Sequence, residues 1–253
     1  SCLVKNKVMS SFKYKHMAAK YVSGTLGRIV KVHNNRILLY HSITSDLSSD
    51  IYDIDSSMFY NQMKILQNSK KKVVELADWP DNNQNVVITF DDGYIDTLTL
   101  AAPILSDFGF NFTVFVSPAL ISSNNKYLNK VELLELASNE YCSIGTHGYS
   151  HCDLTTCNKK KLRNEIHDSK SWLEDLLSTS ICAMSYPYGM VNDKVKNEVD
   201  VAGYKIAVTS DFGSNKLGDD PLLLKRTDIW SFDNIDDYNL KLDGHWDWIK
   251  YIL

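Results

Sequence analysis

The sequence predicts an α/β fold, organised as a (β/α) barrel of about seven strands. The chain has 253 residues, 44% of them apolar, which is enough for one substantial core in one domain. Short apolar runs alternate with longer stretches of helical character over most of its length. Polar, turn-forming clusters follow several of the apolar runs, as they do at the carboxyl ends of barrel strands.

Seven short runs are expected to form the strands, because they are apolar and bounded by turn-forming residues. Most of them are too continuously apolar for a half-exposed antiparallel sheet, which indicates buried parallel strands. In chain order they are residues 37–40, 86–90, 112–116, 142–145, 181–186, 205–208 and 222–228.

Helices are expected between these runs, at residues 58–68, 96–108, 131–137, 159–177 and 193–202. Gly203 follows the last of them as a helix stop. With no repeat, low-complexity tract or linker in the sequence, about seven β/α units in one domain favour a closed barrel.

Residues 1–36 are expected to form a basic, helical arm in front of a single domain at residues 37–253. Residues 1–45 contain eight basic residues and no acid, although the net charge of the chain is -4. The arm is either a solvated helix that docks on the domain or a contact with an anionic membrane surface, and we expect no nucleic-acid partner.

The expected location is the cytoplasm or the periphery of the membrane. No segment approaches the roughly 18 apolar residues that span a bilayer. The five cysteines form no CxxC pair, which fits a reducing compartment. Cys152 and Cys157 are interpreted as free thiols.

Two adjacent carboxylates, Asp91 and Asp92, follow the apolar run at residues 86–90. Burial of both would be unfavourable unless a cation or hydrogen-bond donors compensate. A bound metal is one compensator, and a solvated Asp-Asp-Gly turn is the alternative.

His147 and His151 are four residues apart and chelate one ion if their segment forms a helical turn. Together with one carboxylate they leave an open coordination position, which is typical of catalytic zinc. We therefore expect one divalent metal, Zn²⁺ by preference, with Co²⁺, Ni²⁺ or Mn²⁺ as alternatives. Such an ion lowers the pKa of water and polarises a carbonyl oxygen.

Three ordered segments resemble the motifs of the polysaccharide deacetylases, also called the NodB homology domain or carbohydrate esterase family 4. They are Thr89-Phe90-Asp91-Asp92-Gly93-Tyr94, His147 to His151 followed by Asp153-Leu154, and Tyr186-Pro187-Tyr188-Gly189. The resemblance runs from about residue 37 to the C-terminus. It implies the deformed, NodB-like (β/α) barrel of that family.

The resemblance implies a metal-dependent hydrolase that removes N-acetyl groups from an amino sugar of a glycan or glycan precursor. Asp91 takes the place of the general base, and Asp92, His147 and His151 that of the metal ligands. The backbone N–H of Tyr188 takes that of an oxyanion donor. A carbohydrate-binding relic without turnover and an O-acetyl esterase with the same site remain as alternatives.

The sequence departs from the family pattern at the partner of the base. The family usually has an arginine two residues before Pro187, and this chain has Ser185 there. We expect Arg226 to stand in and to pair with Asp91 through a bidentate contact. The alternative is that Arg226 is a surface charge.

A second departure concerns the general acid, because the usual late Leu-x-His motif is not recognisable. Some related deacetylases carry an early Tyr-His element whose histidine fills this role, and Tyr40-His41 resembles it. His41 is therefore the expected acid, with His245 as its rival. The alternative for His41 is a buried histidine bonded to backbone groups.

Tyr186, Pro187, Trp230 and Trp246 are candidates for substrate binding. Their rings offer faces on which sugars stack. Packing inside the barrel is the alternative for each.

Overall fold

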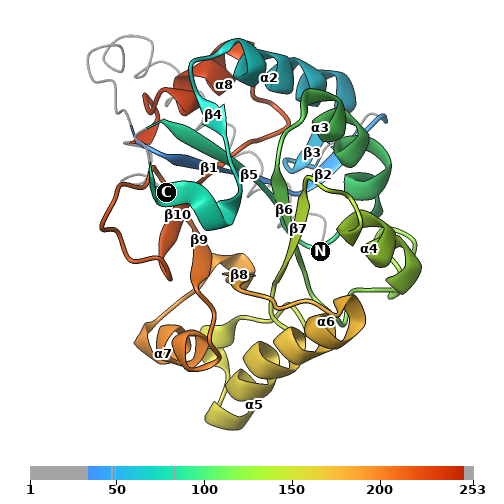
Figure 1. Cartoon of the computed structure of the whole chain (residues 1–253), viewed down its shortest axis with the longest axis vertical. Helices are drawn as coiled ribbons and strands as arrows, with labels where there is room; N and C mark the ends of the chain where they lie inside the picture. The colour runs from blue at the N-terminus through green and yellow to red at the C-terminus, as the bar shows by residue number, and fades with distance from the viewer. Residues whose placement is uncertain (1–33, 47, 49, 82–83, 248–253) are drawn as a thin grey trace, which may run out of the picture.

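Seven parallel strands close into a barrel, which confirms the fold class expected from the sequence (Figure 1). The computed structural model describes residues 34–46, 48, 50–81 and 84–247. The barrel strands are β1 (Arg36–Tyr40), β5 (Asn85–Phe90), β6 (Phe112–Val116), β7 (Cys142–Thr146), β8 (Ala183–Ser185), β9 (Ile206–Phe212) and β10 (Leu224–Asp228). Strand β1 pairs with both β10 and β5, and this double pairing closes the barrel.

Three further strands lie outside the seven. Strand β4 (Lys72–Val73) pairs with the start of β5, and β2 (Ser42–Thr44) pairs with β3 (Asp53–Asp55) in a separate two-stranded sheet. These strands have two or three residues each, too few for a hydrophobic period to reveal them in the sequence.

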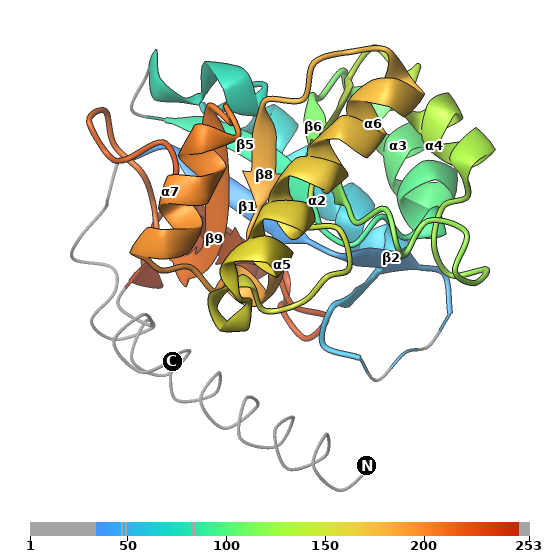
Figure 2. The ribbon, with the colours of Figure 1, turned by 90° about the horizontal axis from the view of Figure 1, so that it is seen from below.

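The helices surround the barrel in both views (Figures 1 and 2). Their ranges are α2 (Ser56–Asn68), α3 (Ala102–Phe108), α4 (Lys130–Ala137), α5 (Lys159–Arg163), α6 (Ser169–Leu177), α7 (Asp193–Val201) and α8 (Ile235–Leu242). Wide helical turns, η3 (Thr97–Ala101) and η5 (Asn164–Asp168), precede α3 and link α5 to α6. The sequence analysis anticipated every helical stretch in this set except α8. No helix in the described part of the chain is long and apolar enough to cross a membrane.

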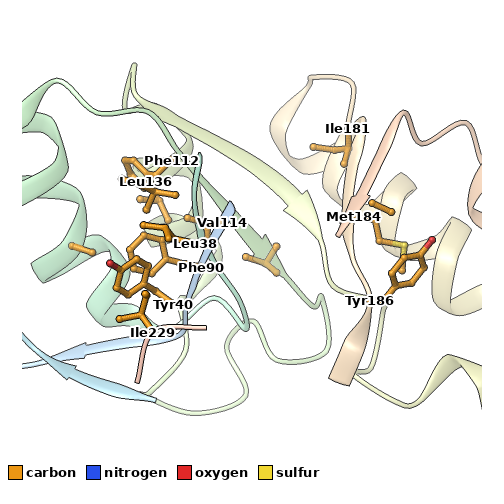
Figure 3. Close-up of a cluster of buried hydrophobic side chains, with 14 of the residues drawn as sticks. Leu38, Tyr40, Phe90, Phe112, Val114, Leu136, Ile181, Met184, Tyr186 and Ile229 are labelled. Atoms are coloured by element: carbon orange, nitrogen blue, oxygen red, sulfur yellow. The ribbon is translucent and has the colours of Figure 1, made fainter. Parts of the chain in front are cut away.

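Alternate residues of the strands face two different cores. Val86, Ile88 and Phe90 of β5 belong to the large cluster under the helices, part of which Figure 3 shows. In that cluster the rings of Tyr40 and Phe90 stack with centroids 5.5 Å apart. Val87 belongs to a second, smaller cluster on the opposite face of the strand, which also receives Ile37, Phe115, Val208 and Leu224. Because strand side chains alternate, Thr89 and Asp91 continue this second face towards the carboxyl end of β5.

Arg36 corrects the boundary of the predicted basic arm. It is 1% exposed and begins β1 instead of ending the arm. Its guanidinium donates to Thr227 Oγ1 at 2.9 Å and to both carboxylate oxygens of Asp247 at 2.8 and 3.2 Å. This charge therefore pairs inside the domain. The rest of the predicted arm, up to residue 33, lies outside the described residues, and its contact with a membrane stays a prediction.

Candidate active site

The carboxyl ends of the barrel strands meet at one cleft of about 330 Å³. Asp91, Asp92, His147 and His151 all line it, together with His41. The parallel barrel places every strand end on the same face, so residues more than 100 positions apart come together there. The cleft is where the sequence analysis expected the site.

A network of hydrogen bonds from two other barrel strands holds the carboxylate of Asp91. Arg226 Nη1 and Nη2 donate to its two carboxylate oxygens at 2.8 and 2.7 Å, which is the contact expected from the sequence. Ser185 Oγ donates to Asp91 Oδ2 at 3.0 Å. Arg226 is completely buried, and its Nε donates to the carbonyl of Thr209 at 2.8 Å, which fixes the plane of the guanidinium. Arg226 thus faces the barrel interior and is not a surface charge.

Burial by itself raises the pKa of the Asp91 carboxyl and is the largest single influence on it. The charge and hydrogen bonds of Arg226, together with the charges of nearby imidazoles, outweigh burial and hold that pKa well below its usual range. The charge of a protonated His147 acts in the same direction. Burial lowers the pKa of His147, however, so its imidazole is neutral near pH 7 and Arg226 supplies the permanent positive charge beside Asp91. Asp91 is therefore an ionised carboxylate at neutral pH.

Asp92 points to the other side of the cleft, towards the two imidazoles. Its Oδ1 lies 3.1 Å from His151 Nε2 and 3.6 Å from His147 Nε2, without the geometry of a hydrogen bond to either. One ligand atom from each of the three residues lies within 4.8 Å of the others. Asp92, His147 and His151 therefore form a cluster with the size of a metal site.

The tautomer of His147 shows that a cation fits this cluster. His147 Nδ1 lies 2.8 Å from the carbonyl oxygen of Ser185, which only accepts, so Nδ1 carries the hydrogen. The lone pair of Nε2 in the neutral ring then faces the carboxylates, with Asp91 Oδ2 at 3.7 Å and Asp92 Oδ1 at 3.6 Å. Electron-rich atoms converging in this way need a positive charge between them.

Glu165 holds the loop that joins the two histidines, and the sequence analysis missed it. Its Oε2 accepts hydrogen bonds from the backbone N–H groups of Tyr149 and Ser150 at 2.9 and 2.8 Å. Its Oε1 accepts from Ser150 Oγ at 2.5 Å, and the residue is only 5% exposed. The available signal was an acid on the apolar stripe of the 159–177 helix, beside Leu162 and Ile166.

Three site residues adopt the left-handed backbone conformation that side chains disfavour. The φ angles are 73° at Asp92, 54° at His151 and 59° at Tyr188. Gly93 also has a positive φ of 71°, and a Cβ there would lie 2.8 Å from Val116 Cγ1. Such strain persists only where the surrounding structure imposes it, and it concentrates at functional sites.

His41 lines the cleft, whereas His245 does not. The His41 ring packs on Tyr52 with centroids 4.3 Å apart, and its Nδ1 has no hydrogen-bond partner among the described residues. His245 is 6% exposed and follows α8, beside Trp246 in the sequence and outside the cleft lining. The structure therefore brings His41, and not its rival, to the cleft that Asp92, His147 and His151 line.

The structure corrects the prediction of four residues for substrate binding, because none of them lines the cleft. Trp230 and Trp246 are 1% and 0% exposed and pack against each other with Phe212. Tyr186 is fully buried, with its hydroxyl donating to the carbonyl of Leu222 at 2.9 Å, and Pro187 is buried as well. A buried ring has no free face for a sugar.

Three other tyrosines, Tyr52, Tyr94 and Tyr188, form the aromatic part of the cleft lining. Tyr188 is 63% exposed, and its ring packs edge-on against His151 with centroids 4.6 Å apart. Tyr94 stacks on Tyr127 with centroids 5.0 Å apart. The position of Tyr94 and Tyr188 inside two of the three predicted motifs was the signal that could have identified them.

A family model described as polysaccharide deacetylase matches residues 79–207. YxkH of Bacillus subtilis, which is named for the same family, is 27% identical over 183 residues that cover 70% of this chain and 65% of the relative. The poly-β-1,6-N-acetyl-D-glucosamine N-deacetylase of Staphylococcus aureus is 24% identical over 212 residues, 76% of this chain and 72% of the relative. The chain spans less than two thirds of the length of the YxkH protein.

Solved structures with the same fold include the Streptococcus pyogenes deacetylase PplD in complex with acetate and IcaB from Ammonifex degensii. PplD superposes with a TM-score of 0.76 at 22% identity, covering 85% of this chain and all of PplD. IcaB superposes with a TM-score of 0.72 at 19% identity, covering 85% of this chain and 98% of IcaB. At these identities the superpositions establish the barrel fold.

Proposed function

Because the chain belongs to the polysaccharide deacetylase family, we propose that it removes N-acetyl groups from an amino sugar of a glycan or glycan precursor by metal-dependent hydrolysis. The observation that carries the proposal is the division of two adjacent carboxylates. Asp91 is paired with a buried guanidinium, and Asp92 converges with two imidazoles in the same cleft. One carboxylate is thereby prepared as a base, and the other as a metal ligand.

Asp92, His147 and His151 hold the metal, for which the imidazole-rich ligand set favours zinc. When bound, a divalent ion polarises the acetyl carbonyl and makes water more acidic. The hydrogen bond from His147 Nδ1 to the Ser185 carbonyl keeps the other ring nitrogen free for the ion.

Asp91 is the general base. Its carboxylate accepts a proton from the water that attacks the acetyl carbon, and it is ionised for this task because Arg226 stabilises the charge. The two hydrogen bonds from Arg226 and the third from Ser185 also fix the orientation of the carboxylate. Ser185 and Arg226 together thus serve the base in place of the family's usual arginine.

His41 is the general acid that protonates the leaving amine nitrogen. Burial lowers the pKa of His41. The charges of Asp91 and Asp92 act in the opposite direction, but the pKa stays below its usual value. The protonated fraction of His41 therefore grows on the acid side of neutrality, where Asp91 is still ionised. The backbone N–H of Tyr188 stabilises the negative charge on the oxygen of the tetrahedral intermediate.

Acetate release from a panel of acetylated glycans by the zinc-reconstituted chain tests the function. The panel includes oligomers of β-1,6-linked N-acetylglucosamine, the polymer in the name of the Staphylococcus aureus relative. Acetate from N-acetylated sugars is the expected result. Release from O-acetylated sugars alone would identify an esterase, and binding without any release would identify a relic.

Metal analysis tests the ligands separately from activity. We expect one bound zinc ion per chain in the wild type and a large loss in His147→Ala. Equal metal content in the two proteins would rule out the site.

Comparison of His41→Ala with His245→Ala tests the acid. At unchanged metal content we expect His41→Ala to lose at least ~100-fold in turnover on an amide substrate. His245→Ala, outside the cleft, should keep its turnover. The reverse pattern would assign the acid to His245.

A further inference from the structure

Two cysteines meet beside His151, one of the proposed metal ligands. Cys152 follows His151 in the sequence, and its Sγ lies 3.5 Å from Sγ of Cys157. Cys152 is half-buried and Cys157 is buried, and both are reduced. Neither sulfur has a role in the proposed hydrolysis.

The local sequence explains why residues five positions apart come together. Asp153 accepts hydrogen bonds from the N–H and the hydroxyl of Thr155 at 2.9 and 2.6 Å, which starts a short 3₁₀ turn, η4 (Leu154–Thr156). The N–H of Cys157 then donates to the carbonyl of Leu154 at 3.3 Å. This turn folds the chain back and sets Cys157 against Cys152.

The segment after His151 is already anchored on both sides. Glu165 holds Ser150 on the N-terminal side. On the C-terminal side, Lys194 from α7 donates to the carbonyl of Cys157. A covalent bond between Cys152 and Cys157 would join the residue next to His151 to the second anchor.

We propose that Cys152 and Cys157 are a redox-active pair that closes to a reversible disulfide and fixes the backbone behind the metal ligand His151. A disulfide bond is about 2.05 Å long, so the two sulfurs must approach by about 1.5 Å from their present 3.5 Å. Rotation about the two Cα–Cβ bonds moves them in this range while the turn stays in place.

The oxidant is a small disulfide such as oxidised glutathione. The Cys152 thiolate, which belongs to the more accessible cysteine, attacks one sulfur of that disulfide and releases one glutathione thiol. Cys157 then attacks Sγ of the mixed disulfide at Cys152, which forms the internal bond and releases the second glutathione thiol. Two electrons leave the cysteine pair and two thiol protons pass to the released glutathione, so the exchange is balanced.

The test titrates the reduced wild-type chain with oxidised glutathione, alkylates the remaining thiols and maps the cysteines by peptide mass spectrometry. Of the five thiols in the sequence, Cys152 and Cys157 should be lost together, with no glutathione on their peptide. Cys182 is the matched control, because it is exposed and should only gain glutathione. Dithiothreitol should restore both thiols.

Two variants sharpen the result. In Cys157→Ser, glutathione should stay on Cys152, whereas Cys182→Ser should still form the internal disulfide. The proposal would be overturned if the wild type accumulated as much mixed disulfide with glutathione at Cys152 as Cys157→Ser does. The proposal would also be overturned if Cys152 and Cys157 both stayed open to alkylation at a glutathione ratio that fully modifies Cys182.

Amide hydrogen exchange measures whether the bond fixes the backbone, and it needs no bound metal. Exchange in residues 150–158 should slow by about threefold or more when the wild type is oxidised, and should not change in Cys157→Ser. Equal exchange in oxidised and reduced wild type would refute the fixing of the segment. A failure of the proposed hydrolysis would leave the thiol and exchange results unaffected.

Discussion

Asp91 and Asp92 are neighbours in the sequence, but the two sides of the cleft that they occupy are built differently. The base side lies inside the barrel, where Asp91 is 3% exposed and receives three hydrogen bonds from two strands. The metal side lies on loops, where Asp92 and His151 have left-handed backbones and Asp92 accepts no hydrogen bond on Oδ1. The proposed base thus has its hydrogen-bond partners in the folded chain, whereas the proposed metal ligands converge on a point where a cation fits.

The difference shows how two adjacent residues come to lie in two different environments. Strand β5 ends at Phe90, and the left-handed backbone at Asp92 and the turn at Gly93 then redirect the chain. Asp91 consequently meets the guanidinium in the barrel, and Asp92 meets the imidazoles on the loop.

Replacement of the base is expected to have the largest effect. Asp91→Asn should lower the rate of acetate release by about 10³-fold, because the amide does not accept the proton from water. Zinc content should stay at the wild-type level, while the matched variant Asp92→Asn should lose both activity and zinc. Loss of zinc in Asp91→Asn would show that the two sides are not separable.

Weakening the guanidinium contact should have the next largest effect. Arg226→Lys keeps the charge and loses the bidentate contact, and we expect a drop of about 10²-fold in kcat/KM. Arg226 holds the Asp91 pKa down, so in the variant that pKa rises. The acid limb of the pH–rate profile, below which Asp91 is protonated and inactive, should therefore move to higher pH. If the acid limb did not move, Arg226 would not control the pKa of Asp91.

Glu165 supports the loop between His147 and His151, and its replacement should lower the affinity for zinc more than the turnover of the zinc-loaded protein. Glu165→Gln removes the charge that receives hydrogen bonds from Tyr149 and Ser150, and zinc affinity should fall by about 10 to 100-fold. Activity should recover at saturating zinc. Glu198→Gln is the control, because Glu198 pairs with His167 away from the cleft. Loss of turnover at saturating zinc would mean that Glu165 serves the chemistry itself.

Asp96 is a carboxylate in a third environment, outside the lining of the cleft. Its replacement should have the smallest effect, a change in the pH dependence of stability. Asp96 accepts hydrogen bonds from Ser42 Oγ and the Ile43 N–H but forms no ion pair with any residue that the structure describes, and burial raises its pKa to about 6. The folded pKa lies above the usual unfolded value of about 3.9, so the free energy of unfolding should decrease as pH rises from about 4 to about 6.

Asp96→Asn should remove this part of the pH dependence and leave the protein more stable than wild type at pH 7. Urea unfolding at several pH values measures it, with the exposed Asp107→Asn as the control. Identical pH profiles for Asp96→Asn and wild type would contradict the raised pKa.

The sequence by itself determined the local features of this protein. Apolar runs and helical periods located the seven barrel strands and most helices, because these patterns depend on residues a few positions apart. The adjacent pair Asp91-Asp92 and the four-residue spacing of His147 and His151 pointed, for the same reason, to the three residues that converge in the cleft. The resemblance to a family added the expectation that Arg226 replaces an arginine missing at Ser185.

Only the tertiary structure decided which distant side chains meet. Arg226 and Asp91 are 135 positions apart, and closure of the barrel brings them into contact. The same closure placed His41 in the cleft and left His245 outside it. It also buried Trp230 and Trp246, for which the sequence analysis had left substrate binding and packing as alternatives. Composition cannot distinguish a buried ring from an exposed one, because burial depends on what the rest of the chain packs against it.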